Sequence, residues 1–227
     1  MKLEMHCHSL GSSFCADCPY VPFIQKFIDN GYDGMVITNH FSKGHFDEYD
    51  VQGDYNAKVT RFFEYFDEYK KLATENGLKV VMGAEVRLSC NGTEYNLLGF
   101  DRDFMFDRVV YALTQEELFN LCNEKGVLLY QTHPYRVGVK PTDPRFMHGA
   151  EVFNGHVGHD NGNEKAKKFC EDNNLIKLVG TDLHHQNQPL TTAMIFRDNI
   201  CDEKQLVKAI FSGEYQIEID FEKVNNL

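Results

Sequence analysis

Short apolar stretches alternate along this chain with longer amphipathic ones, and most of the apolar stretches end in a histidine or an acid. The first stretch runs through Leu3 and Met5, where apolar and polar residues alternate with the period of a half-buried strand. Similar stretches predict strands at residues 35–38, 79–82, 96–100, 127–131, 151–153, 176–179 and 193–196. Helical spacing predicts helices at residues 19–30, 56–76, 115–125, 164–174 and 203–211. Strands that alternate with helices indicate an α/β fold with a mainly parallel sheet.

The number of strands and the residues at their ends favour a closed or nearly closed barrel. In such barrels the active site lies at the C-terminal ends of the strands. An open doubly wound sheet is the alternative, but no glycine-rich phosphate loop follows the first strand. No linker-like stretch divides the chain, so a single domain over residues 1–227 is expected.

The charge and the cysteines restrict the partners and the compartment. A formal net charge of −11 argues against a general electrostatic grip on long nucleic acid, although it does not exclude a nucleotide substrate. Seven cysteines without a regular spacing indicate reduced thiols in a cytoplasmic protein. The first strand begins at once, which leaves no room for a signal peptide, and no apolar run approaches the length of a membrane span.

Histidines and acids follow successive predicted strands. His6 and His8 project from the same face of the first strand about 7 Å apart, so their ring nitrogens can converge on one ion. The residues at the later strand ends are His40, Glu85, Asp101, His133, Asp182 and His184. Any one of them is compatible with a surface position or a helix cap, but the whole set in one cup would be costly to desolvate without cations. The pattern therefore predicts a site for divalent metal ions.

The same motifs carry a resemblance to a known family. His6-x-His8, Thr38-Asn39-His40, Gly83-Ala84-Glu85, His133-Pro134 and Gly180-Thr181-Asp182-Leu183-His184 resemble the successive motifs of the PHP (polymerase and histidinol phosphatase) superfamily. The resemblance implies a distorted (β/α)7 TIM-like barrel, two or three bound metal ions (zinc, manganese or iron) and hydrolysis of phosphoesters. Asn154-Gly155-His156 resembles the small stand-alone phosphoesterases of the superfamily more than its polymerase-attached domains.

The resemblance also implies a ligand set. One metal would be held by His6, His8, Glu85 and Asp182; Glu85 would bridge to a second metal that His133 also binds; His40 and His184 would serve a third. The chain departs from the commoner pattern in three places: it has Glu4 before the first histidine, Cys15, Asp17 or Cys18 in the first loop, and Asp101 after the fourth strand. Asp101 and Cys15 are accordingly the less typical candidates for metal ligands.

Three further residues are candidates for contact with the substrate. Arg136 follows His133 by three residues, and its guanidinium can grip a phosphate with two hydrogen bonds. His156 is a candidate to protonate the leaving oxygen or to bind substrate, and Asn154 is expected beside it. Glu85 is the candidate catalytic carboxylate, because it would bridge the ions that generate the nucleophile.

The favoured hypothesis is a metal-dependent phosphatase that acts on a small phosphomonoester, with histidinol phosphate as one family precedent. A phosphodiesterase or nucleotidase acting on nucleotides or short oligonucleotides is the alternative within the same class. A non-catalytic metal-bound module that supports a partner protein is a different class. An amidohydrolase-type barrel also opens with His-x-His, but Glu85 occupies the strand end where a modified lysine is often the bridge.

Overall fold

The computed structural model describes residues 1–10, 13, 15–17, 19–48 and 51–225. Its strands are β1 (Lys2–Cys7), β2 (Gly34–Ile37), β3 (His40–Phe41), β4 (Lys79–Arg87), β5 (Glu94–Leu98), β6 (Leu128–Gln131), β7 (Gly149–Asn154), β8 (Ile176–Gly180), β9 (Thr192–Phe196) and β10 (Tyr215–Ile219). Its α-helices are α1 (Tyr20–Asp29), α2 (Lys43–Glu48), α3 (Tyr55–Glu75), α4 (Arg102–Phe106), α5 (Gln115–Lys125), α6 (Asn163–Asp172), α7 (Glu203–Ser212) and α8 (Phe221–Asn225). Two short 3-10 helices are η1 (Val110–Ala112) and η2 (Pro144–Phe146).

The strands form one sheet in the order β10-β9-β1-β2-β4-β5-β6-β7-β8, with β3 paired to β4. A parallel bridge from Cys7 to Leu183 joins the end of β1 to the segment after β8, so the sheet curls into a nearly closed barrel. Backbone hydrogen bonds support this closure, because the His8 amide donates to the Leu183 carbonyl over 2.9 Å. The expected α/β barrel is therefore confirmed.

One strand of the barrel runs against the others. β5 pairs antiparallel with both β4 and β6, whereas β1–β2, β2–β4, β6–β7 and β7–β8 are parallel pairs. β4 and β5 form a hairpin with no helix between them, and β9 and β10 extend the sheet outside the barrel as an antiparallel pair on β1. The structure thus departs from a regular strand–helix repeat at the hairpin and at the C-terminal strands.

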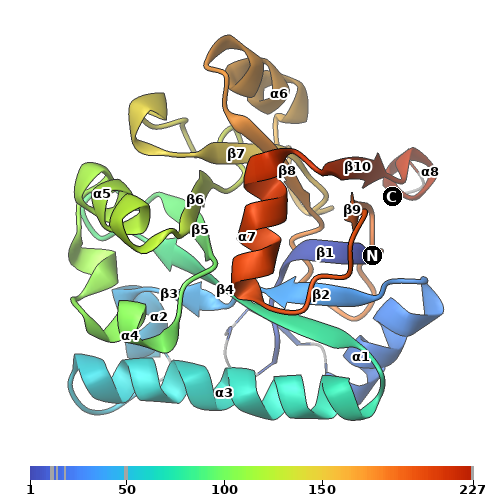
Figure 1. The fold of residues 1–227 in the computed structure, drawn as a ribbon, viewed down its shortest axis with the longest axis horizontal. Coiled ribbons are helices and arrows are strands. Elements are labelled where there is room, and N and C mark those ends of the chain that lie inside the picture. Colours follow the sequence, from blue (N-terminus) through green and yellow to red (C-terminus); the bar gives the residue numbers. More distant parts are fainter. Residues whose placement is uncertain (11–12, 14, 18, 49–50, 226–227) are drawn as a thin grey trace.

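Helices surround the sheet, with α3 along one side and α7 across the face turned to the viewer in Figure 1. The apolar stripe of α3 packs inward, as its spacing predicts: Phe62, Phe63 and Phe66 are buried in a cluster shared with Phe23 of α1 and Leu121 of α5. Side chains of α7 belong to a second cluster that includes strand residues of β1, β4 and β5. These two apolar clusters hold the barrel wall in place.

Local signals explain where the main helices begin and end. Asp54 caps α3 by accepting a hydrogen bond from the Ala57 amide. Thr114 and Glu117 form a reciprocal capping box at the start of α5, which ends at Gly126 in the left-handed conformation. None of the helices within the described part of the chain combines the length and apolar character needed to cross a bilayer.

β4 is longer than the predicted strand at residues 79–82 and carries Glu85 inside it. Small residues allow this extension, because a Cβ on Gly83 would lie 2.9 Å from Leu98 and 3.0 Å from Val36 and Thr38 side chains. The strand therefore runs through the crowded barrel interior and delivers Glu85 to the rim.

Candidate metal centre

The predicted ligands from β1, β3, β4 and the segments after β6 and β8 meet at one rim of the barrel. His6 and His8 alternate along the end of β1 with Cys7, which faces the apolar cluster on the other side of the strand. His6, His8, Glu85 and Asp182 are buried to within 1% of complete burial, and His133 and His184 are 3% and 7% exposed. Residues separated by nearly 180 positions in the sequence thus form one buried cluster.

Glu85 lies at the centre of this cluster. Its Oε1 is 3.3 Å from the Nε2 atoms of His6 and His133, and its Oε2 is 2.8 Å from His40 Nδ1. His8 Nε2 lies 3.6 Å from Glu85 Oε2. One carboxylate therefore faces four imidazoles, which is the arrangement expected of a group that bridges metal ions.

Asp182 forms the second acidic side of the cluster. Its Oδ1 is 3.3 Å from the Nε2 atoms of both His6 and His8, and 3.4 Å from His184 Nδ1. His6, His8 and Asp182 each offer one ligand atom, and these atoms all lie within 4.8 Å of one another. This spacing suits a single divalent ion.

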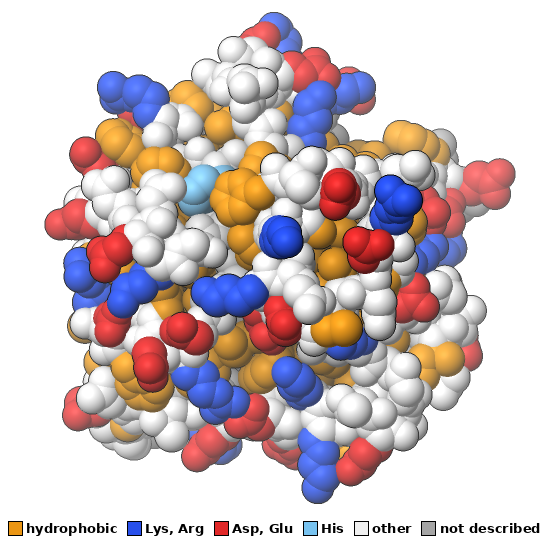
Figure 2. Space-filling view, in the orientation of Figure 1, with side chains coloured by type: hydrophobic (Ala, Val, Ile, Leu, Met, Phe, Trp, Pro, Cys, Tyr) orange, Lys and Arg blue, Asp and Glu red, His pale blue; other side chains and the backbone are white. Residues whose placement is uncertain are grey.

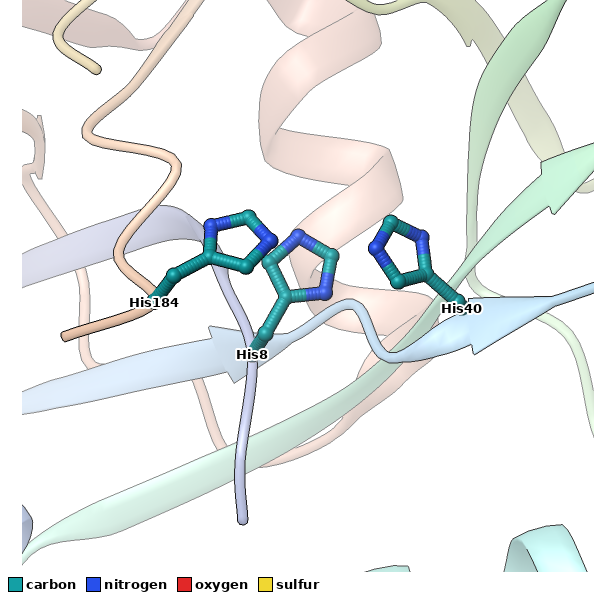
Figure 3. A group of neighbouring side chains, drawn as sticks. All are labelled: His8, His40 and His184. Carbon is teal, nitrogen blue, oxygen red and sulfur yellow. The ribbon is translucent and has the colours of Figure 1, made fainter. Parts of the chain in front are cut away.

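Three rings line a second part of the cluster. Figure 3 shows the ring of His8 between those of His184 and His40, and the ring centroids are 4.1 Å and 4.4 Å from that of His8. Their ligand atoms also lie within 4.8 Å of one another. The three histidines come from separate elements, so the barrel fold itself creates this group.

The rings of the cluster differ in how readily they hold a proton. Burial by itself lowers the pKa of His6, but attraction to the buried carboxylates, led by Asp182, outweighs burial and raises that pKa well above its usual value. Burial, and then repulsion from His184 and His40, lowers the pKa of His8 well below its usual value. The pKa values of neighbouring rings thus shift in opposite directions, because only some of the rings can carry a proton.

The carboxylates remain ionised in this setting. Burial raises the pKa of Glu85, but attraction to His6 and the close approach of the His133 and His40 rings outweigh it and hold that pKa well below its usual range. Attraction to His6 and His184 likewise overcomes the effect of burial on Asp182. Two ionised acids at the bottom of a buried cup attract cations strongly.

The donor set fits divalent metal ions on a direct structural test. Glu85 Oε1 is buried and accepts no hydrogen bond from any described residue, which is costly unless another group satisfies it. His6 Nε2 and His8 Nε2 face each other at 3.1 Å, where two ring nitrogens with lone pairs repel unless a proton or a cation lies between them. Metal ions among these atoms would satisfy the carboxylate and both rings.

The prediction that Asp101 joins this cluster is wrong. Because β5 is antiparallel to its neighbours, its C-terminal end points to the opposite end of the barrel. Asp101 caps α4 there by accepting a hydrogen bond from the Phe104 amide over 3.1 Å. A residue that follows a strand reaches the rim of the metal cluster only when that strand is parallel to the others.

Glu94, at the start of β5, lies at the rim in place of Asp101. Its Oε2 is 3.7 Å from His133 Nε2, and it forms a group with His40 and Glu85 that could hold an ion. The sequence contained a signal for this reversal, because Asn91-Gly92 is a dipeptide typical of tight hairpins. Gly92 has a positive φ of 70°.

The loop after β1 brings one sulfur to the cluster. Cys15 Sγ lies 3.2 Å from His40 Nε2. Asp17 is exposed and pairs with His185 at 3.2 Å, so it does not take part, and Cys18 lies outside the described residues. Of the two described candidates in this loop, Cys15 is the one whose side chain lies beside a predicted ligand.

The side chains of Arg136 and Asn154 both donate hydrogen bonds to Asp182 Oδ2. The Arg136 guanidinium donates to Asp182 Oδ2 and to the side-chain oxygens of Asn154 and Asn161, both at 3.1 Å. The Arg136 side chain is 15% exposed, so it reaches the rim while it is held by these partners. It is therefore a fixed cation beside the acidic cluster.

His156 lies at the edge of the cluster, with its ring 5.6 Å from that of His184. Its Nδ1 accepts a hydrogen bond from the Gly158 amide over 3.0 Å, which places the proton of the neutral ring on Nε2. Burial lowers the pKa of His156 to about 4. A neutral ring that donates through Nε2 suits binding of an oxygen better than release of a proton.

Glu151 of β7 was not predicted as part of the site. Its side chain is buried, and its Oε1 lies 2.6 Å from His6 Nδ1. A lone acid between Ala150 and Val152 in an apolar strand was the only sequence signal for it. Such a residue needs a buried partner, and here the partner is a predicted metal ligand.

Comparison with known proteins identifies the family and the fold of the chain. The PHP domain family model matches residues 4–219. No curated protein matches the chain. Several solved structures share its fold, at sequence identities below 20%.

Three of these structures illustrate the range of structural similarity and coverage. A two-domain protein from Bacteroides vulgatus ATCC 8482, described as containing a predicted PHP-like metal-dependent phosphoesterase, has a TM-score of 0.66 at 19% identity; the match covers 96% of this chain and 64% of that protein. PsfC from Pseudomonas syringae PB-5123 has a TM-score of 0.68 at 16% identity, with 99% and 93% covered. The lesion-specific endonuclease PfuEndoQ from Pyrococcus furiosus has a TM-score of 0.59 at 15% identity, with 95% and 57% covered. The chain thus spans less than two thirds of the Bacteroides and Pyrococcus proteins.

Proposed function

Since this chain belongs to the PHP domain family, we propose that it is a metal-dependent phosphoesterase that hydrolyses a small phosphomonoester. The observation that carries the proposal is Glu85, a buried carboxylate whose Oε1 has no hydrogen bond from the described part of the chain and faces ring nitrogens of His6 and His133 at 3.3 Å. A structural neighbour described as a metal-dependent phosphoesterase supports the same class of reaction.

The ligands divide into three groups around the two acids. We assign His6, His8, Glu85 and Asp182 to one ion. Glu85 and His133 would hold a second ion, with Glu94 as an added oxygen ligand in the place expected for Asp101. His40 and His184 would hold a third. Zinc, manganese and iron all accept such mixed imidazole and carboxylate sets.

Bound ions would polarise the phosphoryl oxygens and activate water near neutral pH. The protein itself would orient the ester. Arg136, fixed by Asp182, Asn154 and Asn161, presents its guanidinium to a phosphate oxygen, and Asn154 holds it there. His156 donates from Nε2 to the phosphate or to the leaving oxygen. Both residues lie on the Asp182 side of the cluster, so the leaving group would extend over that side.

A phosphodiesterase acting on nucleotides or short oligonucleotides is the second candidate, because cavities lie on both sides of the centre. One of about 460 Å³ includes His40, Glu94, Lys43 and Arg87 in its lining, and one of about 550 Å³ includes His156. Two cavities could take the two arms of a diester. Positive and negative side chains alternate on the α7 face drawn in Figure 2, and the formal net charge of −11 favours a small substrate over a long nucleic acid. A non-catalytic module that supports a partner is the third candidate.

Hydrolysis of matched model esters tests the proposal. We expect 4-nitrophenyl phosphate to be hydrolysed in the presence of manganese or zinc, and bis(4-nitrophenyl) phosphate to be hydrolysed more slowly, with release of nitrophenolate as the measurement. Activity confined to the diester would favour the second candidate. A protein that binds metal fully and hydrolyses neither ester would favour the non-catalytic module.

Cys15 supplies a prediction about the third ion. We propose that it completes this site with His40 and His184, in place of an imidazole. Burial raises the pKa of the thiol, but hydrogen bonds with His184 and His40 outweigh it and lower the pKa to about 6, so the thiolate ligand is accessible. Protein loaded with cobalt(II) should show thiolate-to-cobalt charge transfer in the near ultraviolet, and Cys15→Ser should lose it.

Exposed Cys90 provides the matched control, because it lies outside the cluster. Cys90→Ser should keep the absorption band of the wild type. An absorption band that persists in Cys15→Ser would rule out Cys15 as a ligand. It would not change the assignment of ligands to the other two ions. The seven cysteines have no regular spacing, which supports the proposed cytoplasmic location, where thiols stay reduced.

A further inference from the structure

The carboxylate of Glu151 holds two separate parts of the metal centre. Its Oε1 lies 2.6 Å from His6 Nδ1, and its Oε2 accepts a hydrogen bond from the His133 amide over 2.8 Å. Oε2 also accepts from Asn154 Nδ2 over 3.0 Å. His6 precedes Glu151 by 145 positions and His133 precedes it by 18, so this side chain connects ligands that the sequence separates.

The His6 contact determines which nitrogen of that ring faces the cluster. His6 Nε2 lies 3.3 Å from both Glu85 and Asp182, so it is the nitrogen that would bind an ion. A neutral ring that binds through Nε2 carries its proton on Nδ1, and Glu151 accepts that proton in a hydrogen bond. Carboxylates in this position fix the tautomer and orientation of metal-binding histidines.

The His133 contact stabilises an unusual backbone. Among the described residues, the non-glycine residues with positive φ are His133 at 31°, Asn174 at 53° and Asp182 at 54°. Two of these three are predicted metal ligands, and such conformations are strained for residues with a side chain. Glu151 binds the His133 amide directly and is connected to Asp182 through Asn154, whose Nδ2 lies 3.3 Å from Asp182 Oδ2.

The neighbouring strand leaves room for this side chain. A Cβ on Gly180 of β8 would lie 2.8 Å from Glu151 Oε1 and 2.3 Å from His6 Cβ. Any side chain at position 180 would therefore displace the His6–Glu151 pair. Because glycine has no side chain, the Glu151 carboxylate and the His6 ring can meet in the barrel interior.

We propose that Glu151 is a positioning residue that sets the His6 ring and the His133 backbone for metal binding at both ends of the Glu85 bridge. The inference rests on the proposed metal centre and adds a residue outside its ligand set. All three partners donate to Glu151, so the position requires two acceptor oxygens. A carboxamide offers only one, and its amino group would face a donor.

Glu151→Gln is therefore expected to lower the affinity for cobalt(II) or zinc by about 10- to 100-fold, because one of the two ligands loses its hydrogen bond. Metal affinity is measured by adding metal to a mixture of the metal-free protein, residues 1–227, and a competing chromophoric chelator. Glu171→Gln is the matched control, since Glu171 is an exposed glutamate in α6 that pairs with Lys177 at 2.9 Å. It should bind metal like the wild type.

Thermal unfolding in excess chelator separates positioning from general stabilisation. A metal-free Tm close to that of the wild type, with weakened metal binding, supports the proposal. Unchanged metal affinity overturns it, whatever happens to the Tm.

If Glu151→Gln does not fold, Glu151→Asp gives the same test, because it keeps the charge but is one methylene too short to hold both ligands. Wild-type affinity in that variant overturns the proposal. A wild-type protein that binds no metal would overturn the proposed function together with this inference.

Discussion

Replacing Glu85 with glutamine is expected to reduce kcat for phosphoester hydrolysis by about 10³-fold or more, equivalent to about 4 kcal/mol of transition-state stabilisation. Glu85 faces His6, His133 and His40 at 2.8 to 3.3 Å. The amide has no charge and one oxygen, so it cannot bridge two cations, and its amino group would point at nitrogens that act as ligands. Both the ions and the nucleophile they generate should be lost together.

The measurement is kcat on the model monoester together with the number of metal ions per chain. Glu64→Gln is the control, since Glu64 is an exposed glutamate that pairs with Arg61 on α3. It should keep both wild-type activity and wild-type metal content. Retention of more than about a tenth of the activity by Glu85→Gln would contradict the bridging role.

Removal of metal is expected to lower the Tm by about 10 °C or more, since even one site contributes this much. Ions that bind the folded state at about 10³ times their dissociation constant stabilise it by about 4 kcal/mol per site. For a domain of this size, 1 kcal/mol corresponds to about 2–4 °C. The effect should be measurable by comparing unfolding in excess chelator with unfolding in added zinc or manganese.

The size of this difference should depend on pH, because protons and metals compete for the same rings. In the metal-free protein the pKa values of His6 and His40 are raised well above the usual value, since nearby carboxylates and, for His40, hydrogen bonds with Cys15 and Glu85 outweigh burial. The stability that these groups contribute is fully present below about pH 6.5 and is lost as pH rises through the raised values. Metal binding requires neutral rings, so it gains as pH rises.

The acids act in the opposite direction at low pH. The pKa values of Glu85 and Asp182 are held well below their usual range, so their contribution is present above about pH 4 and is lost as pH falls through the lowered values. The Tm difference between loaded and chelated protein should therefore widen between about pH 6 and pH 8. A difference that stays constant or narrows over this range would argue that these rings do not bind metal.

Much of the barrel could be predicted from the sequence, because buried strands and amphipathic helices have different apolar periods. Residues 115–125 form a helix as expected, since Thr114, Glu117 and Gly126 provide both of its boundaries. The direction of β5 could not be predicted from the same pattern, because the two-residue period is identical for parallel and antiparallel strands. Asp101 was therefore assigned to the wrong end of the barrel and Glu94 was missed.

The site was predictable where its residues carry their own chemistry at strand ends. His6, Glu85, His133 and Asp182 lie together as their positions indicated. Glu151 was not predictable in this way, since its importance comes from three partners that only the folded chain brings to it. Contacts of this kind depend on the relative placement of β1, β6 and β7, which a single sequence does not encode locally.

The β4–β5 hairpin gives the mouth of the barrel one stiff side. Residues 88–93 are tied by hydrogen bonds from the Leu88 amide to the Thr93 carbonyl and from the Gly92 amide to the Leu88 carbonyl. Lengthening this turn would draw Glu94 away from His133. The connection on the other side exposes Val157 and His159, which can be substituted while Asn161 keeps its contacts with Arg136 and the His156 carbonyl. Redesign of substrate choice should therefore begin with the connection that carries His156.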